Sequence, residues 1–504
     1  MTYYHDLKPE NLRQATIILL IASGLLLIAI MSVNPTVAIL TRFRNLPPSL
    51  FVVLLLTGSI SLIVILLLMF SKPQLISPIL ALVLPFEVIP ILNTYGFRDL
   101  DLITPILLLA ILALLMRVPF TKLKLYRTQL EVPVALFLVS AFTAAILSYR
   151  PAITMFSYVK YSKVFFLMFL LFALLRKVSE KDIARTLVAY VTGATIVGVY
   201  SIIAYVAVLL YQVSTYMVLL SPVGTPRIRG TLRDANIAAA YYIPVTLLCL
   251  YWLLRKRSGW AWYLTLAAFL ISLTNLVLTV SRSGILGFAI AGLVWFALIY
   301  RVVLKKFSRI ISLAMIVLLF VVALIAFEGP RNQIFARSSE IIDRLTGSSW
   351  DTAASNVMHT KMAEWAIEAF KANPWGVGRW NLPYLIGLDR LSIFGYTTIE
   401  QVLAEGPPVH SSWLEILVSE GVGGIIAFIW IIVIVFRSGW FALRKRTFPW
   451  NGESAVLTAS FCGILISMIF YTYDWMYFVW FLIGLQQVFY FRSQDLELTG
   501  IEAQ

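Results

Sequence analysis

The stretch HSSWLEILVSEGVGGIIAFIWIIVIVF, residues 410–436, decides the class of protein. Its second half is an uninterrupted apolar run, which is typical of a helix that crosses a membrane. Comparable runs of about 20 residues recur along the chain. Of the 504 residues, 60% are hydrophobic and only 13% are charged, whereas a soluble domain carries about 25% charged residues. The sequence therefore predicts an all-α polytopic membrane protein.

The apolar runs predict about 14 transmembrane helices, within a range of 12–14. We expect them at about 15–33, 49–70, 74–95, 102–116, 130–148, 157–175, 186–210, 235–254, 259–279, 284–300, 310–327, 412–436, 453–471 and 476–491. Pro78, Pro85 and Pro90 interrupt the third run, so a re-entrant pair is the alternative there.

Four regions follow from this pattern. N-terminal transmembrane helices occupy 1–185, and central ones with arginine motifs occupy 186–327. One large extracytoplasmic loop with short helices is expected at 328–411, and C-terminal helices with a short cytoplasmic tail at 412–504.

The basic residues predict the orientation. With the N-terminus inside, the cytoplasmic segments carry 23 of the 40 Lys and Arg residues and the short outer loops carry eight. Such a bias places the termini and the basic loops in the cytoplasm and 328–411 outside. It also accounts for the net charge of +15 without a nucleic-acid partner. Cys249 and Cys462 lie inside apolar runs and indicate neither disulfides nor a metal site.

The large loop contains one amphipathic segment, SNVMHTKMAEWAIEAFKANPWGVG. Its apolar residues recur at helical spacing: Met358, Met362, Trp365, Ala366 and Ala369. Asn373-Pro374 is expected to end this helix, and Gly376 and Gly378 to form a turn. The helix is expected to lie on the membrane surface or to cap a cavity.

Residues suited to chemistry gather at the predicted outer face. PRIRGTLRDAN offers Arg227, Arg229, Arg233 and Asn236, and TVSRSGIL is a tight turn with Arg282 at its tip. His410 stands at the outer end of the twelfth predicted span. Each has a plainer interpretation, since arginines at this level also bind lipid headgroups and a histidine at a helix mouth also serves as a capping residue.

Taken together, these residues favour a reaction at a lipid pyrophosphate. Guanidinium groups bind phosphates in a bidentate fashion, and histidine is suited to general-base work near neutral pH. The inner face shows no acidic metal motif and no glycine-rich phosphate loop. We therefore expect no metal and no cofactor, and as partners a lipid-linked donor, an acceptor and membrane lipids.

The sequence resembles the O-antigen ligase and O-antigen polymerase superfamily. His410-Ser411, nine residues, Gly421 and Gly424 fit the ligase motif His-[Asn/Ser/Gln]-x9-Gly-x-x-[Gly/Thr/Tyr], and Arg282 to Leu286 fits Arg-x3-Leu. RGTLRDAN resembles the family's Gly-Thr-(Phe/Leu)-x-(Asn/Asp)-x-Asn stretch, and EWAIEAFKANPWGVG its Trp-x-x-Ala…Pro-x-Gly-x-Gly stretch. The agreement in order and spacing extends over about 227–424.

The resemblance implies a metal-independent glycosyltransferase of cell-surface polysaccharide or lipopolysaccharide biosynthesis, in the bacterial inner membrane with its active site outside. The donor would be a glycan on undecaprenyl (polyprenyl) pyrophosphate. Arg282 and an arginine of the 227–233 group would hold the pyrophosphate, and His410 would deprotonate the acceptor hydroxyl. Many members carry an arginine where this chain has Lys361, so Arg337 or Arg344 is expected to supply the missing phosphate contact.

Several functions stay open at this level. A ligase would use lipid A-core as acceptor, a polymerase another lipid-linked repeat, and a third member class transfers glycans to protein. The alternative from another class is a flippase for lipid-linked sugars. A flippase is expected to keep essential charges near mid-membrane, whereas a transferase keeps them at the outer face.

Overall fold

The computed structural model describes residues 63–87, 102–117, 127–211, 215–220, 226–255, 259–304, 350–394, 397–399, 409–445 and 448–498. Its elements are η1 Pro73–Leu75, α4 Ile76–Val83, α6 Ile103–Arg117, α7 Glu131–Leu147, α8 Pro151–Leu175, α9 Glu180–Tyr211, β1 Val218–Leu220, β2 Pro226–Ile228, α10 Ala235–Arg255, α11 Trp260–Leu278, α12 Arg282–Leu304, α15 Trp350–Ala372, α16 Leu382–Ile386, α17 Leu388–Leu391, η3 Ser392–Phe394, α19 Ser412–Arg444, α20 Asn451–Ser467 and α21 Tyr477–Leu498. The predicted spans at 15–33 and 310–327 lie outside the described residues.

The helices confirm that the chain is a mostly helical membrane protein. Five helices of the described ranges are long and apolar enough to cross a bilayer, namely α9, α10, α11, α19 and the first 18 residues of α12. A sixth is added if the bent pair Ile63–Ser71 and Pro73–Val83 counts as one broken span. This break lies between Ser71 and Pro73, before the predicted span at 74–95 and before the three prolines that were expected to interrupt it. The total of 14 spans stays a prediction.

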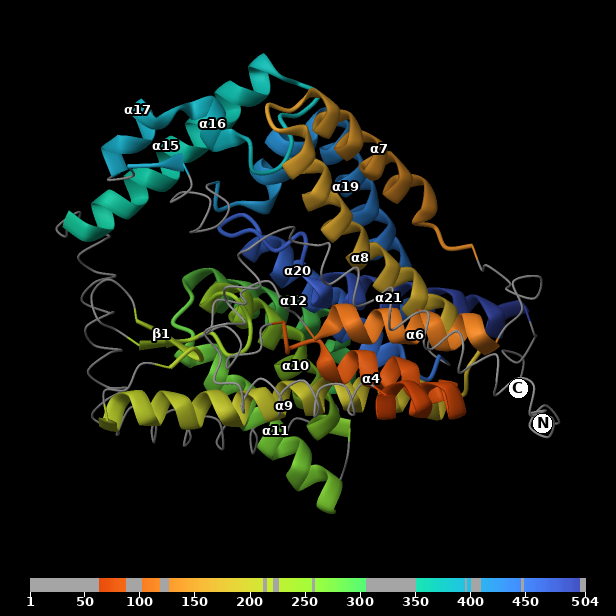
Figure 1. Ribbon diagram of the computed structural model, residues 1–504. Helices are drawn as coiled ribbons and strands as arrows, with labels where there is room; N and C mark the ends of the chain where they lie inside the picture. Colours follow the sequence, from red (N-terminus) through yellow and green to blue (C-terminus); the bar gives the residue numbers. More distant parts are fainter. Residues whose placement is uncertain are drawn as a thin grey trace. The chain divides into compact units, whose positions relative to one another are not determined.

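The chain divides into two compact units, residues 1–76 with 87–124 and residues 77–86 with 125–504. The second unit holds every residue of the site below. In it α12 packs along α20, α7 along α19, α10 beside α11, and α21 beside α8 (Figure 1). Glycines allow the closest of these contacts: a Cβ on Gly463 of α20 would lie 2.3 Å from the carbonyl oxygen of Gly287 in α12. Small residues at such crossings let membrane helices approach backbone to backbone.

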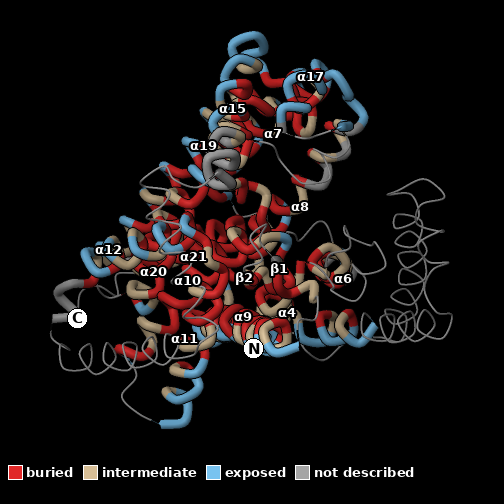
Figure 2. Tube along the Cα trace, turned by 90° about the vertical axis from the view of Figure 1, so that its left-hand side faces the viewer, coloured by how far each residue is buried: buried red, intermediate tan, exposed pale blue. Residues whose placement is uncertain are grey.

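Burial separates the central helices from the peripheral ones. The apolar part of α10 is 83% buried inside the protein, whereas that of α12 is 33% buried. Figure 2 shows the same contrast, with α10, α20 and α21 largely in the buried colour. The first turn of this central helix contains Asn236, one of the candidate site residues.

One element departs from the all-helical expectation. The chain between α9 and α10 forms a small antiparallel hairpin, with Val218 opposite Ile228 and Leu219 opposite Arg227. The sequence analysis expected only a loop there. The strands are three residues each, too short for a periodic sequence pattern to reveal them.

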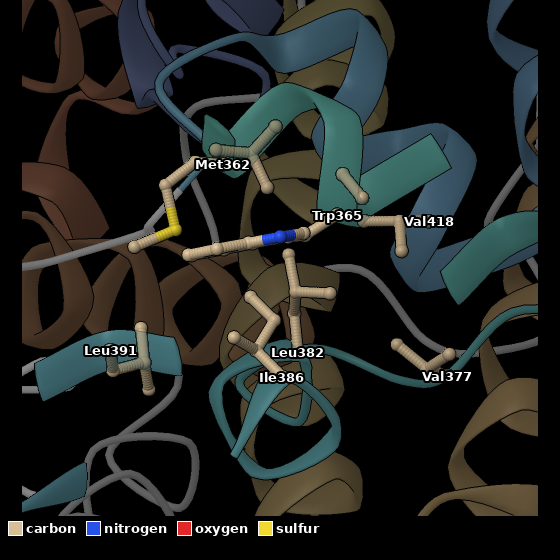
Figure 3. Packing of buried hydrophobic residues seen from close by; sticks show 9 residues of the cluster. Met362, Trp365, Val377, Leu382, Ile386, Leu391 and Val418 are labelled. Atoms are coloured by element: carbon tan, nitrogen blue, oxygen red, sulfur yellow. The ribbon is translucent and has the colours of Figure 1, made fainter. Parts of the chain in front are cut away.

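The amphipathic segment forms α15 and ends at Ala372, as predicted. Its apolar face is buried: Met362, Trp365 and Ala366 pack with residues of α16, α17 and α19 (Figure 3). Val409, directly before His410, belongs to the same cluster. The apolar face of α15 is therefore covered by protein, and this packing attaches the helix to the segment that carries His410.

Candidate functional site

Three helices begin at one end of the second unit, and their first turns form the site. Asp234 caps α10, because the Asn236 amide donates to Asp234 Oδ1 at 2.7 Å. Ser281 caps α12, because the Gly284 amide donates to Ser281 Oγ at 3.1 Å. Such side-chain caps satisfy amides that have no partner inside the helix. Both capping residues belong to the motifs that the sequence singled out.

The two arginine motifs form one hydrogen-bonded unit. Arg227 Nε donates to the Thr279 carbonyl at 2.9 Å, and Arg227 Nη2 donates to Asn236 Oδ1 at 3.2 Å. Ser281 Oγ donates to the same Asn236 oxygen at 2.8 Å. Arg227 and Asn236 therefore hold the turn before Arg282 in place. The two motifs are thus in direct contact.

The start of α19 is attached to the turn between α20 and α21. The Ser412 amide donates to the Met468 carbonyl at 2.9 Å, and Ser412 Oγ donates to the Tyr471 carbonyl at 3.1 Å. The Tyr473 amide donates to Ser412 Oγ at 2.7 Å. Ser411 occupies the N-cap position of α19. His410 therefore precedes the cap, beside this turn.

Tyr471 joins His410 to the arginine motifs. Its ring centroid lies 5.8 Å from that of His410. The pKa of its phenol is raised well above the ordinary value by burial and then by the charge and hydrogen bond of Asp234. The phenol thus stays protonated and can donate to that carboxylate. His410, Tyr471 and Asp234 connect the mouth of α19 with the cap of α10.

Tyr471 and Asp234 were not among the residues predicted from the sequence. A signal was present in the run FYTYDW, residues 470–475, where two tyrosines and an acid interrupt apolar sequence. Asp234 lies inside the RGTLRDAN motif, in which only the arginines and Asn236 were predicted as site residues. The sequence around either residue does not indicate a function, because the two come together from parts of the chain more than 200 residues apart.

Backbone strain is concentrated around this site. Among the described residues the non-glycine positions with positive φ are Val280 (φ 49°), Trp380 (φ 68°) and His410 (φ 49°). A positive φ is costly for a β-branched residue such as valine and uncommon for the others. Val280 precedes the cap of α12 and His410 precedes that of α19. Strain of about 1–3 kcal/mol at such positions often marks a functional site.

The other predicted residues have varied surroundings. Arg282 is the exposed first residue of α12. Arg229 lies over the Tyr216 ring at 3.9 Å, and the exposed Arg233 lies 5.2 Å from the Trp475 ring centroid. Lys361 pairs with Glu364 at 2.7 Å on the exposed side of α15. Arg337 and Arg344 lie outside the described residues.

The glycine motifs of the loop and of α19 interlock. Gly421 has φ 71° and ψ −164°, which breaks the helix. In an unbroken helix the carbonyls of Val418 and Ser419 would accept amides four residues later. Here they accept the Val377 and Gly378 amides, each at 2.9 Å, and the Val422 amide donates to the Pro374 carbonyl at 2.9 Å.

The turn at 374–378 therefore replaces hydrogen bonds that the break in α19 removes. Contact is so close that a Cβ on Gly421 would lie 2.4 Å from the Trp375 carbonyl carbon, and one on Gly376 would lie 2.5 Å from the Ser419 oxygen. The close packing at Gly421 is therefore with a loop turn.

Arg379 follows that turn and was not singled out from the sequence. It is 4% exposed. Its Nε donates to Glu420 Oε1 at 2.7 Å, and its Nη2 donates to Asp474 Oδ2. Burial lowers the pKa of the guanidinium, but Asp474 and Glu420 outweigh that effect and hold the pKa well above its ordinary value. Arg379 is therefore a fixed positive charge.

No cluster of three or more His, Cys, Asp or Glu side chains within the described ranges is arranged to hold a metal ion. The polar groups of the site are guanidinium, imidazole, phenol, amide and hydroxyl groups together with the Asp234 carboxylate. Such a set suits the binding of phosphate oxygens and the transfer of a proton.

The fold and the site define a helical membrane protein whose polar functional residues gather where helices begin. Residues 267–429 match the O-antigen ligase family. This segment is similar to the O-antigen ligase family, in agreement with the resemblance that the motifs indicated. The matched segment includes Arg282, the turn at 374–378 and His410. A search of curated proteins finds no match. This match supports glycan transfer of the ligase or polymerase type at the level of the family.

Proposed function

We propose that the protein transfers a glycan from a polyprenyl-pyrophosphate carrier to an acceptor hydroxyl at the extracytoplasmic face of the bacterial inner membrane. The observation that carries the proposal is the hydrogen-bonded connection between the starts of α19 and α12. The Ser412 amide donates to the Met468 carbonyl, and the neighbouring Ser467 Oγ donates to the Ser283 carbonyl at 2.8 Å, next to Arg282. In this proposal, the general base His410 and the phosphate-binding N-terminus of α12 with Arg282 belong to one site.

Arg282 binds the pyrophosphate in this proposal. It stands at the N-terminus of α12, where the helix dipole and the first amides also favour an anion. Arg233, exposed at the mouth of α10, is the member of the 227–233 group best placed to assist. Arg227 is engaged with Thr279 and Asn236, so its contribution is to hold the turn.

His410 acts as general base. The acceptor oxygen forms a bond to the anomeric carbon while the bond from that carbon to the phosphate oxygen breaks. The hydroxyl proton passes to the imidazole, and the electron pair of the broken bond leaves with the polyprenyl pyrophosphate, whose charge the arginines stabilise. Tyr471, held by Asp234, keeps the imidazole beside the acceptor.

The test uses purified protein in lipid nanodiscs with a polyprenyl-pyrophosphate oligosaccharide. Incubation with lipid A-core, with a second lipid-linked oligosaccharide or with pilin should release polyprenyl pyrophosphate in step with one extended product. The acceptor that is extended separates ligase, polymerase and protein-transferase activity. A flippase would leave the donor intact and move it across the bilayer of a sealed liposome, and that result would replace this proposal.

A further inference from the structure

A buried ionic group lies beside the site and has no part in the chemistry above. The Arg379 guanidinium lies over the Tyr161 ring, 4.1 Å from its centroid, and the Tyr161 hydroxyl donates to Asp474. Arg379, Glu420 and Asp474 are each at most 4% exposed. An ionic group this deep must be matched closely by its partners, because desolvation of each charge costs several kcal/mol.

The two acceptors of Arg379 belong to the two segments that hold the site together. Glu420 ends the first part of α19, the part that starts directly after His410. Asp474 lies three residues after Tyr471 in the turn between α20 and α21. One guanidinium, carried by the loop, therefore bonds the helix of His410 to the turn of Tyr471. Ser412 makes the second connection between the same two segments.

A third carboxyl group, Glu415, is also buried and serves as an internal comparison. It is 5% exposed, accepts a hydrogen bond from Ser419 at 3.0 Å and has no ion pair among the described residues. Its Oε2 has no hydrogen-bond partner in the described part of the chain. Glu415 is thus buried as Glu420 is, but it forms no ion pair with Arg379.

We propose that Arg379 is a positioning residue that sets the geometry between His410 and Tyr471. It is too buried to touch substrate, and it acts through Glu420 and Asp474. The inference rests on the proposed function for its catalytic consequence. It extends that function by assigning a task to the extracytoplasmic loop: the turn at 374–378 and Arg379 fix the helix of the general base from the loop side.

The experiment compares Arg379→Lys, Glu420→Gln and Asp474→Asn with the matched control Glu415→Gln. Two readouts are taken. One is kcat and the donor KM in nanodiscs. The other is the rate at which diethyl pyrocarbonate modifies His410, followed by peptide mass spectrometry with His5 as reference. The second readout reports on the surroundings of the imidazole without any turnover.

In the three test variants kcat should fall on the order of 10²-fold, the loss expected from a displacement of about 1 Å between reacting groups, while the donor KM changes little. The modification rate at His410 should change relative to His5. Glu415→Gln should leave kcat and the modification rate unaltered, because Glu415 forms no ion pair with Arg379. Equal behaviour of Glu420→Gln and Glu415→Gln in both readouts would overturn the proposal.

A neutral triple variant separates positioning from stability. Arg379→Met with Glu420→Gln and Asp474→Asn removes all three charges together, and buried ion groups are often replaced in this way without loss of stability. The variant should fold and stay slow. Recovery of the wild-type kcat and of the wild-type His410 modification rate would show that the three charged groups only stabilise the fold, and the positioning role would then be wrong. If the triple variant does not accumulate, the Glu420→Gln and Glu415→Gln pair decides alone.

The experiments distinguish a failure of the proposed transfer chemistry from a failure of the positioning role of Arg379. If His410→Ala retains full activity, the proposed chemistry is wrong, yet the modification rates still decide whether Arg379 controls the surroundings of His410. If His410→Ala is inactive and Arg379→Lys behaves as wild type in both readouts, the chemistry stands and the positioning role is wrong.

Discussion

The amide of Val377 donates to the carbonyl of Val418 at 2.9 Å, across the break in α19. This bond joins a loop turn to the helix that starts after His410. It exists because Gly421 leaves helical geometry and frees the carbonyls before it. The loop motif and the histidine motif thus pack together as one unit. Gly376 and Gly421 each allow the close approach of the other segment's backbone.

Gly421→Ala should therefore destabilise the protein. Its φ and ψ fall in a region that only glycine occupies readily, at about 1–3 kcal/mol for other residues, and the added Cβ would meet the Trp375 backbone. Gly292→Ala is the matched control in α12, where a Cβ meets nothing within 4 Å. That change should be neutral or stabilising by about 0.5–1 kcal/mol. Thermal unfolding in detergent measures both, and equal melting temperatures for the two variants contradict this account.

His410→Ala should lose most transfer activity while still binding the donor. A general base contributes roughly 10²–10⁴-fold, and the arginines would still hold the pyrophosphate. His410→Gln should be similarly poor, because an amide cannot accept the proton. Turnover, donor binding and melting temperature are measured on both variants. A silent His410→Gln together with an unstable but active His410→Ala would leave the histidine a purely structural residue.

Arg282→Ala should severely reduce transfer, and Arg282→Lys should be nearly as damaging, because a point charge cannot replace the guanidinium fork. Arg255→Ala is the control at the other end of α10, where Arg255 pairs with Glu453 at 3.4 Å. It should retain activity. Membrane accumulation of each variant is checked by immunoblot. Near-normal turnover by Arg282→Ala removes the phosphate-binding role from this residue.

Tyr471→Phe tests the link between His410 and Asp234. The substitution keeps the ring against the imidazole and removes the hydroxyl that bonds Asp234. Loss of one such hydrogen bond to a charged group is worth about 1.5–3 kcal/mol, so kcat should fall by about tenfold or more. Tyr211→Phe, at a tyrosine that is 74% exposed, is the control. Wild-type kinetics in Tyr471→Phe would show that the Tyr471 ring supports activity without its hydroxyl.

The orientation is tested by cysteine labelling. Cysteines replace Lys256 and Trp350 in a chain in which Cys249 and Cys462 are changed to serine. A membrane-impermeant maleimide applied to intact spheroplasts should label position 350 and reach position 256 only after the membrane is opened. The physical reason is the accumulation of Lys and Arg in the loops on the side of residue 256. Labelling of both positions from one side reverses or refutes the predicted topology.

Much of the fold could be predicted from the sequence. The expected spans at 235–254 and 259–279 correspond to α10 and α11, Ala235–Arg255 and Trp260–Leu278. This works because a segment in lipid must satisfy its own backbone and present apolar side chains, so the requirement is local. The same locality made Arg282 and His410 recognisable, since each stands in a polar interruption directly before an apolar run.

The tertiary structure alone decided which polar residues act together. Arg379 meets Glu420 and Asp474 across 41 and 95 positions, and Tyr471 meets His410 and Asp234 from a third part of the chain. Periodicity and composition describe neighbours along the chain, whereas these contacts depend on how whole helices pack. The sequence thus determined a helical membrane protein with a segment similar to the O-antigen ligase family. Packing determined the contacts that surround its histidine, because glycines at Gly376 and Gly421 let a loop replace helix hydrogen bonds.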